Sequence, residues 1–274
     1  MSSAEGLEVG FAEVEGSRWR VAWRPPQPGD GRPPLVLCNG IGVNWELLLP
    51  LVRALGSRPL VAFDVPGTGD SPALAEPYRM SGLASQVIAL LDRLDVHRFD
   101  ALGVSWGGAL AQQLALQAGA RCRRLVLAAT STGWASFPGE LSALVQLADR
   151  RRLADPRHAG RVLPQVYGGQ VRREPALLRE YLRQVKPPTQ RGYTHQTLAL
   201  AGWTSVWWLP CLAQPTLILA GRDDPLVPLA NAHVMQRLLR RAELEIVEDG
   251  HLFLHTRAAE VGPRIARFLD GHRP

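Results

Sequence analysis

Short runs of apolar residues recur along the chain and are separated by stretches in which apolar residues repeat every three or four positions. Residues 7–25 alternate between apolar and polar side chains on both sides of Glu15 and Gly16, a pattern that predicts a β-hairpin turning at that dipeptide. Six further apolar runs predict buried strands, at residues 34–40, 59–67, 98–105, 123–130, 215–221 and 243–249. Helical spacing lies between them, as at residues 81–95 and 108–119.

This alternation of apolar runs with helical patterns predicts an α/β fold with a mostly parallel central sheet. Parallel strands need long crossover connections, and strands that are apolar throughout are covered by helices on both faces. The alternation breaks once, because residues 134–210 hold helical patterns but no clear strand. We therefore predict a core formed by residues 1–133 and 210–274, with residues 134–209 inserted as a helical lid.

Tryptophan is concentrated in the inserted segment, which holds four of the eight tryptophans in the chain. Three of these four lie in the stretch GWTSVWWLP. A single tryptophan in such a place belongs most often to the core of the lid itself, whereas a cluster also fits an apolar underside that faces a ligand. We predict that Trp203, Trp207 and Trp208 line the substrate site.

Composition narrows the class of protein further. A chain of 274 residues that is 46% hydrophobic can bury a large core. No apolar run approaches the ~20 residues of a membrane span, and residues 1–10 have neither the basic nor the apolar segment of a secretory signal. The three cysteines, Cys38, Cys122 and Cys211, are odd in number and widely spaced, which favours a reducing compartment over a disulfide framework. We expect a soluble, cytoplasmic protein.

The net charge of +6 comes from one segment. Residues 133–209 carry 11 basic and 5 acidic residues, whereas the rest of the chain carries 20 of each. No nucleic-acid recognition motif accompanies this excess, and the nearby tryptophans do not alternate with the basic residues as a stacking platform would. We therefore expect no nucleic-acid partner.

A serine stands between glycines in GVSWG, residues 103–107, with a predicted strand before it and a predicted helix after it. Glycines permit the tight turn that lifts a serine oxygen clear of the backbone, and the helix N-terminus favours a developing oxyanion. The pattern G-x-S-x-G fixes only three positions, so a plain glycine-rich turn would satisfy it as well. Matching partners later in the chain lead us to take Ser105 as the candidate nucleophile.

A serine nucleophile needs a base, and that base needs an acid to orient it. Asp223 and Asp224 directly follow the predicted strand at residues 215–221. We choose Asp224 as the acid because it stands four residues before Pro228 in the pattern G-x-x-D-x-x-x-P. Asp223 is expected to face solvent or to cap the loop.

His251 is the candidate base among the seven histidines, because it follows the last predicted strand by a short loop. His255 lies one helical turn further along the chain. The pair lacks the intervening glutamate of the metal-binding pattern with this spacing, so we expect no metal site.

An oxyanion hole in this chemistry uses the amide that follows the nucleophile and a second amide from the loop after an early strand. The first of these amides belongs to Trp106. The loop reads Asn39-Gly40-Ile41-Gly42, in which glycines let backbone N–H groups point into the site, and Ile41 is the expected second donor.

Several stretches between about residue 35 and residue 260 resemble the intracellular poly(3-hydroxyalkanoate) depolymerases that degrade medium-chain-length storage polyester. They are NGIGVNWELLLPLV, AFDVPGTGDS, GVSWGGALAQQLA, RLVLAAT, YGG, GWTSVWWLP, QPTLILAGRDDPLVPL and EDGHLFLHTR. The resemblance implies an α/β-hydrolase fold and a serine esterase that uses no metal or organic cofactor. It carries the catalytic positions over as Ser105, Asp224 and His251, and it implies a polyester substrate at the surface of storage granules.

Other activities fit parts of the same pattern. Haloalkane dehalogenase and epoxide hydrolase chemistry would need a carboxylate in place of Ser105. A carboxylesterase acting on small esters is the nearest alternative, and a hydrolase of C–C bonds would suit the three catalytic positions equally. A non-catalytic ligand-binding receptor of this fold is disfavoured because all three positions are occupied by reactive residue types.

Overall fold

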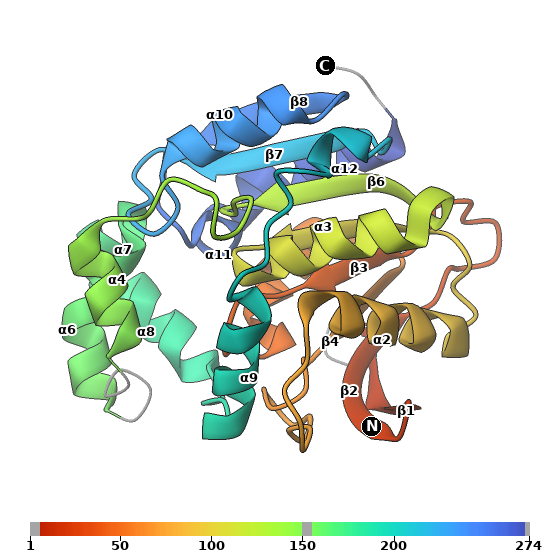
Figure 1. Cartoon of the computed structure of the whole chain (residues 1–274), viewed down its shortest axis with the longest axis horizontal. Helices are drawn as coiled ribbons and strands as arrows, with labels where there is room; N and C mark the ends of the chain where they lie inside the picture. Colours follow the sequence, from red (N-terminus) through yellow and green to blue (C-terminus); the bar gives the residue numbers. More distant parts are fainter. Residues whose placement is uncertain (1–5, 150–154, 272–274) are drawn as a thin grey trace.

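An eight-stranded sheet forms the centre of the computed structural model, which describes residues 6–149 and 155–271 (Figure 1). The strands follow the order β1-β2-β4-β3-β5-β6-β7-β8. β1 pairs with β2 and β2 pairs with β4 in antiparallel fashion, whereas all other neighbours are parallel. The bounds are β1 Glu8–Val14, β2 Ser17–Arg24, β3 Leu35–Cys38, β4 Leu60–Phe63, β5 Phe99–Val104, β6 Cys122–Ala128, β7 Thr216–Gly221 and β8 Ala242–Val247.

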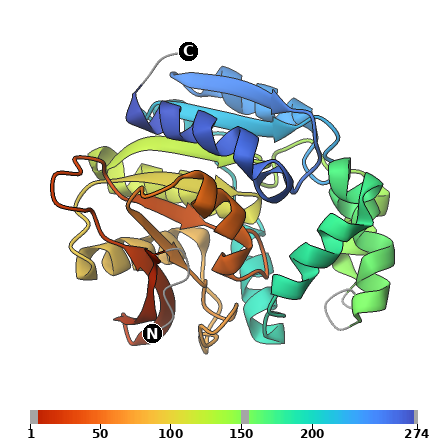
Figure 2. The same cartoon turned by 180° about the vertical axis from the view of Figure 1, so that it is seen from behind.

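Helices cover both faces of this sheet. α2, α3 and α10 lie on the near face in Figure 1, and α1, α11 and α12 lie on the opposite face, which Figure 2 brings forward. Their bounds are α1 Leu49–Ala54, α2 Met80–Arg93, α3 Trp106–Ala118, α10 Leu229–Leu238, α11 Phe253–Thr256 and α12 Ala258–Asp270, with 3-10 turns at Trp45–Leu48 (η2), Gly119–Arg121 (η3) and Leu209–Cys211 (η4). Within the described ranges, no helix is long and apolar enough to cross a membrane.

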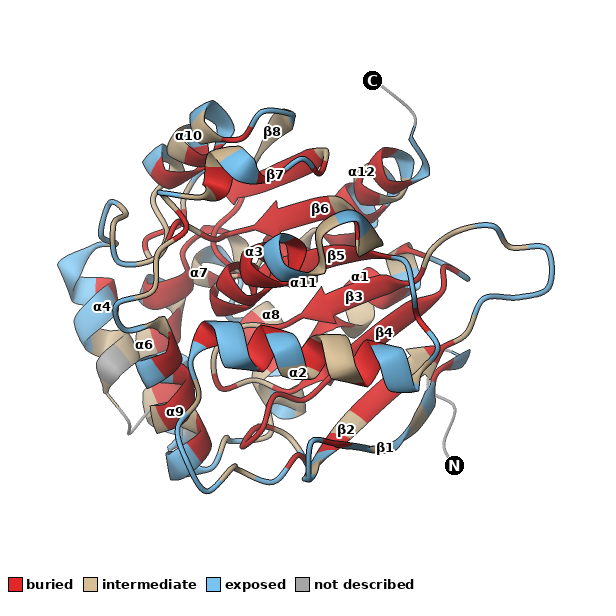
Figure 3. Ribbon diagram, turned by 45° about the vertical axis from the view of Figure 1, so that its right-hand side comes forward, coloured by how far each residue is buried: buried red, intermediate tan, exposed pale blue. Residues whose placement is uncertain are grey.

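Two apolar cores, one on each face, hold the helices to the sheet. β3, β4, β5 and β7 are buried along their whole length (Figure 3), as strands covered on both sides must be. α2 turns Leu83, Val87 and Leu90 inward at helical spacing, and each such side chain contributes roughly 1.5–3 kcal/mol on full burial. The prediction of an α/β fold with a mostly parallel sheet is confirmed.

The predicted hairpin is present as β1 and β2. Val14 pairs with Ser17 across the turn, and Glu15 and Gly16 both have positive φ, at 47° and 78°. Two positive φ angles give the backbone twist that matches two antiparallel strands. All six strands predicted from the apolar runs also form. The prediction of burial is wrong for β8, which is mostly half-buried because it lies at the edge of the sheet.

The segment predicted as a lid contains helices and stands beyond one end of the sheet (Figures 1 and 2). Its described helices are α4 Leu141–Ala148, α6 Pro156–Tyr167, α7 Gly169–Arg173, α8 Pro175–Gln184 and α9 Gln190–Leu200. A third apolar cluster joins α6, α7 and α8 around Val166, Leu178 and Tyr181, with Leu47 from the core. An isolated bridge between Gly133 and Thr204 brings the two ends of the segment together. The division into core and lid stays a prediction, and we use the name lid below for residues 134–209.

Candidate active site

Ser105 occupies a sharp turn between β5 and α3. Its φ and ψ of 54° and −122° lie in a region that side-chain-bearing residues rarely adopt, and such a conformation costs on the order of 1–3 kcal/mol. The surrounding structure holds the turn in place, because the Ser105 amide donates to the Ala128 carbonyl at 2.9 Å and the Thr130 hydroxyl donates to the Ser105 carbonyl at 2.7 Å. The turn presents the serine side chain beyond the end of β5.

Two glycines of the GVSWG pattern are required by close packing. A Cβ atom at Gly103 would lie 2.3 Å from the Gly107 carbonyl oxygen, and one at Gly107 would lie 2.1 Å from the Cys38 carbonyl oxygen. No side chain fits at such distances, so α3 can approach β5 and β3 this closely only with glycine at both positions. The sequence pattern around Ser105 is therefore a packing requirement of the turn.

Asp224 and His251 meet in a buried hydrogen bond. His251 Nδ1 lies 2.8 Å from Asp224 Oδ2, and the Asp224 side chain is 0% exposed. The other carboxylate oxygen, Oδ1, accepts hydrogen bonds from the amides of Leu226 and Val227 at 2.9 and 3.0 Å. These amides aim the carboxylate at the imidazole, which leaves Nε2 as the nitrogen available to a nucleophile.

Asp223 faces away from this pair. Its side chain is 41% exposed, accepts from the Gly169 amide at 2.9 Å and lies 3.4 Å from Arg172. The choice between the two neighbouring aspartates thus agrees with the geometry, since only Asp224 reaches His251.

Tyr167, at the end of α6, supports His251 from the lid side. The Tyr167 carbonyl accepts the His251 amide at 2.7 Å, and the two rings stack at 6.0 Å with an interplanar angle of 8°. The following Gly168 and Gly169 have positive φ, and a Cβ at Gly169 would lie 1.9 Å from the Gly250 amide nitrogen. The YGG stretch therefore lets the lid backbone pack directly on the histidine loop.

Ser105 and His251 line one cavity of about 220 Å³. Within the described residues, the Ser105 hydroxyl forms no hydrogen bond, so Ser105 and His251 are not hydrogen-bonded to each other in this structure. Catalytic hydrogen bonds are often long in ligand-free enzymes and shorten when substrate binds. The structure thus brings the three predicted residues to one site with the acid–base link already formed.

The predicted oxyanion donors also lie at this site. Ile41 belongs to both cavities that Ser105 lines, and Trp106 follows the nucleophile as the first residue of α3. In the described part of the chain, neither backbone amide donates to a protein acceptor. Both amides are therefore free to donate to a ligand oxygen.

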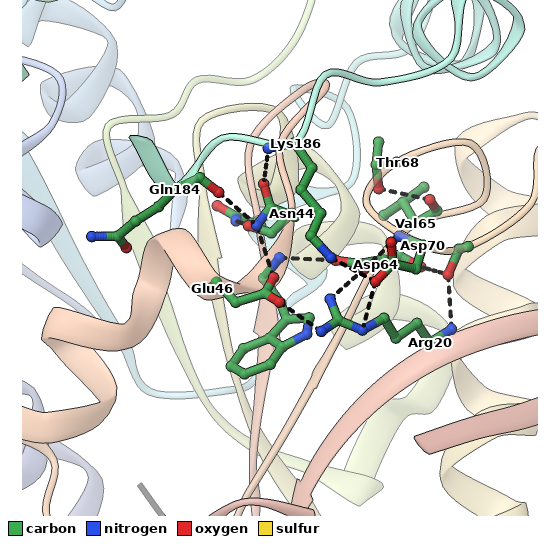
Figure 4. Close-up of polar contacts among 12 residues, drawn as sticks. Arg20, Asn44, Glu46, Asp64, Val65, Thr68, Asp70, Gln184 and Lys186 are labelled. Carbon is green, nitrogen blue, oxygen red and sulfur yellow. Dashed lines mark hydrogen bonds and ion pairs between the residues drawn. The ribbon is translucent and has the colours of Figure 1, made fainter. Parts of the chain in front are cut away.

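A buried polar network fixes the loop that carries Ile41 (Figure 4). Asn44 is fully buried, accepts from the Lys186 amide at 2.8 Å and donates to the Gln184 carbonyl at 3.1 Å. These bonds connect the loop to the last residue of α8 and to the segment that follows it. Beneath it, Asp64 accepts from the Trp45 amide at 2.9 Å and from Arg20 at 3.2 Å. Burial raises the pKa of the Asp64 carboxyl, and the hydrogen bonds that Asp64 accepts oppose that rise.

Ser105 also lines a second cavity, of about 750 Å³. Its walls include Trp134 and Phe137 from the start of the lid, Leu144 from α4 and Leu198 from α9. The smaller cavity is lined by Leu163, Tyr167 and Tyr181 of the lid, among others, and by His255. Burial lowers the pKa of His255, so this ring is neutral at neutral pH. Both walls are mainly apolar.

The structure does not place the predicted substrate-binding tryptophans at either cavity. Trp203 donates from its indole N–H to Gln113 Oε1 at 2.9 Å and packs edge-on against Trp208 at 5.9 Å, which fixes both rings against the α3 side of the core. Trp207 is 77% exposed. The cluster lies after α9, where it anchors the return of the chain to the core, and the lid helices supply the cavity walls instead.

A sequence profile of the α/β hydrolase fold family matches residues 33–258. With this sheet order and this turn at Ser105, the chain belongs to the α/β-hydrolase fold family. The protein is 45% identical over 262 residues to the poly(3-hydroxyalkanoate) depolymerase of Ectopseudomonas oleovorans, which covers 95% of this chain and 92% of that relative. The resemblance found in the sequence is thereby confirmed.

Two further similarities are more distant. The chain is 28% identical over 255 residues to a 2-hydroxymuconate semialdehyde hydrolase of Pseudomonas sp. strain CF600, covering 86% of each chain. The crystal structure of the enol-lactonase from Burkholderia xenovorans LB400 superposes with a TM-score of 0.81 at 23% identity, covering 95% of this chain and 100% of that one. The latter similarity concerns the fold.

Proposed function

We propose that this protein is a serine hydrolase that cleaves the ester bonds of a poly(3-hydroxyalkanoate). Ser105 is the nucleophile, His251 the base and Asp224 the acid that orients the imidazole. The amides of Ile41 and Trp106 form the oxyanion hole. The similarity to a relative named as such a depolymerase supports the substrate class.

The proposed reaction is a two-step acyl transfer. Ser105 Oγ attacks the ester carbonyl while His251 Nε2 takes its proton, and the resulting oxyanion is held by the two amides, each contributing roughly 3 kcal/mol. The tetrahedral intermediate collapses as His251 returns the proton to the leaving alkoxide, which departs as the alcohol end of the polymer. Water then attacks the acyl-enzyme while His251 Nε2 takes its proton. The bond to Ser105 Oγ breaks as His251 returns that proton to the serine, and the acyl fragment leaves with a new carboxylic acid end.

The observation that supports a polyester substrate most strongly is that Ser105 lines two cavities with mainly apolar walls. A small ester needs one such pocket for its acyl group, whereas a polyester presents an apolar unit on both sides of every ester bond. The two cavities offer a place for both units. Ile41, Leu147 and Leu226 line both cavities, so a chain that crosses Ser105 stays in apolar surroundings.

An exposed apolar surface at the mouth of the larger cavity supports action on an insoluble polymer. We call this surface the rim; it consists of Trp134, Phe137, Leu141, Leu144 and Val145. Trp134, Phe137 and Leu144 also line the cavity that Ser105 lines, and Leu141 and Val145 lie within one helical turn of Leu144 on α4. Exposed apolar side chains that gather at a cavity mouth are typical of surfaces that bind apolar partners. The rim is proposed to rest on the polyester granule.

The substrate proposal is tested by comparing three classes of substrate. We expect hydrolysis of p-nitrophenyl esters that improves from C2 to C8, and clearing of a medium-chain-length polyester latex. Cleavage of soluble esters without any attack on the latex would favour the small-ester carboxylesterase. Preferential turnover of a ring-fission product would favour the C–C bond hydrolase, an activity class to which the 28% identical relative points.

A further inference from the structure

Gln196 connects the lid to both halves of the proposed oxyanion hole. This residue lies on α9 and is 0% exposed. Its side-chain oxygen, Oε1, accepts a hydrogen bond from the Gly42 amide at 2.8 Å. Its backbone carbonyl accepts a hydrogen bond from the indole N–H of Trp106 at 2.9 Å. Gly42 directly follows Ile41, so one lid residue holds the residue after the first donor and the side chain of the second donor, Trp106.

The bond to Gly42 fixes the orientation of the turn at Ile41. With the Gly42 amide bound to Gln196, the peptide between Ile41 and Gly42 cannot rotate freely, and the preceding amide of Ile41 keeps one direction. Of the two polar groups of the Gln196 side chain, only the oxygen can accept a hydrogen bond, so Oε1 is the atom that faces the Gly42 N–H. Since a donor must lie within a few tenths of an ångström of the oxyanion to be effective, the position of this turn matters for the reaction.

α9 is packed closely against the loop at Gly67, so its contacts can fix the position of the loop that carries Ile41 and Gly42. The Thr189 amide donates to the Gly67 carbonyl at 3.0 Å, and a Cβ at Gly192 would lie 2.4 Å from the Gly67 carbonyl oxygen. A Cβ at Gly42 would meet the Tyr193 ring at 2.9 Å. The other end of the loop is held by Asn44 through Gln184 and Lys186 (Figure 4). The Ile41 turn is thus fixed on both sides by lid segments.

We propose that Gln196 is a positioning residue that holds the Ile41 and Trp106 amides in the geometry of the oxyanion hole. The inference rests on the proposed function only in requiring a serine hydrolase, and it holds for any ester substrate. A positioning role of Gln196 has one consequence that a general packing role does not have. Loss of Gln196 should weaken binding of the tetrahedral state and leave binding of the ground state intact.

The test compares Gln196→Met with the wild-type protein on a soluble p-nitrophenyl ester. Methionine keeps nearly the same length and volume but has no oxygen to accept from Gly42. We expect kcat to fall roughly 10- to 100-fold while KM changes less than about threefold, as expected for a misplaced oxyanion donor. Gln190→Met is the matched control, because Gln190 lies exposed on the same helix and its substitution should leave kcat unchanged.

Two further measurements separate positioning from folding. The rate at which a fluorophosphonate labels Ser105 should fall in parallel with kcat, since the phosphoryl oxygen occupies the oxyanion hole. The melting temperature should fall by only a few degrees relative to Gln190→Met, because the buried Gly42 N–H loses its acceptor. Gln196→Glu retains an acceptor and should recover part of the lost kcat. If Gln196→Met does not fold, Trp106→Phe replaces it, because this change removes the indole donor and keeps the Trp106 amide.

The outcomes distinguish this inference from the proposed function. Wild-type protein that is neither labelled nor active on any ester would overturn the proposed function itself. A labelled, active wild type together with a Gln196→Met variant of equal kcat and labelling rate would overturn the role of Gln196 alone. An increase in KM at unchanged kcat would also overturn it, because that result assigns Gln196 to substrate binding.

Discussion

The rim makes a prediction that separates docking on a polymer from catalysis. Leu141 and Val145 lie four residues apart on α4, are 77% and 62% exposed, and line neither cavity. Replacing both with glutamate places two charges where the polymer surface should rest. Because these side chains do not reach the site, the chemistry at Ser105 should be unaffected.

The size of the effect follows from the exposed area of these two side chains. Full burial of an aliphatic side chain of this size stabilises by roughly 1.5–3 kcal/mol. Scaled by their exposed fractions, the pair contributes up to about 2–4 kcal/mol on docking, which corresponds to roughly 30- to 1000-fold in binding to the surface. The desolvation of the introduced carboxylates would increase this loss.

The assay measures the initial rate of latex clearing at limiting enzyme and the rate on a soluble p-nitrophenyl ester, with the same preparations. We expect the double glutamate variant to lose at least about 30-fold on the latex and less than about twofold on the soluble ester. Leu116→Glu is the control, because Leu116 is 36% exposed on α3, near the end remote from Ser105. Equal latex rates for the double variant and the control would refute the docking role of the rim.

Three further predictions concern single residues. Asp224→Asn should lower kcat roughly 10³- to 10⁴-fold. Asp223→Asn removes an exposed carboxylate and should change kcat less than about threefold. Similar kcat values for the two variants would contradict the assignment of Asp224 as the acid. Because burial holds the pKa of His255 below 6.5, the unfolded chain binds this proton more readily, so stability should fall as pH drops below about 6.5. The melting temperature of His255→Gln should therefore fall less between pH 7 and pH 5.5 than that of the wild type. Trp207→Ala should leave both the melting temperature and the chain-length profile unchanged, and a selective loss on long esters would restore Trp207 to the site.

Much of the fold could be predicted because its signals are local. Central strands such as β3 and β4 are continuous apolar runs, the hairpin turns at a Glu-Gly pair, and the Ser105 turn requires glycine at fixed offsets. Asp224 was separable from Asp223 for the same reason: the position in the loop after β7 decides which carboxylate turns inward.

The lid could not be predicted in the same way, because its side chains are placed by contacts distant in sequence. Trp203 belongs to the core through Gln113, 90 residues earlier in the chain. Gln196 contacts Gly42, 154 residues earlier, and nothing in the polar stretch QRGYTHQ that ends at Gln196 indicates that contact. An apolar cluster indicates burial, but it does not say which surface the residues are buried against.

The central claim is that Ser105 cleaves a polyester, and the most direct measurement is the release of 3-hydroxyacids from medium-chain-length polyester latex by the wild-type protein and by Ser105→Ala. We predict steady release by the wild type and a loss of at least about 10³-fold in the variant, with its melting temperature unchanged, because the serine, histidine and aspartate act as a unit. Release by Ser105→Ala at a rate near that of the wild type would contradict the assignment of the nucleophile. A wild-type protein that hydrolyses soluble esters but releases no hydroxyacid from the latex would contradict the polyester substrate.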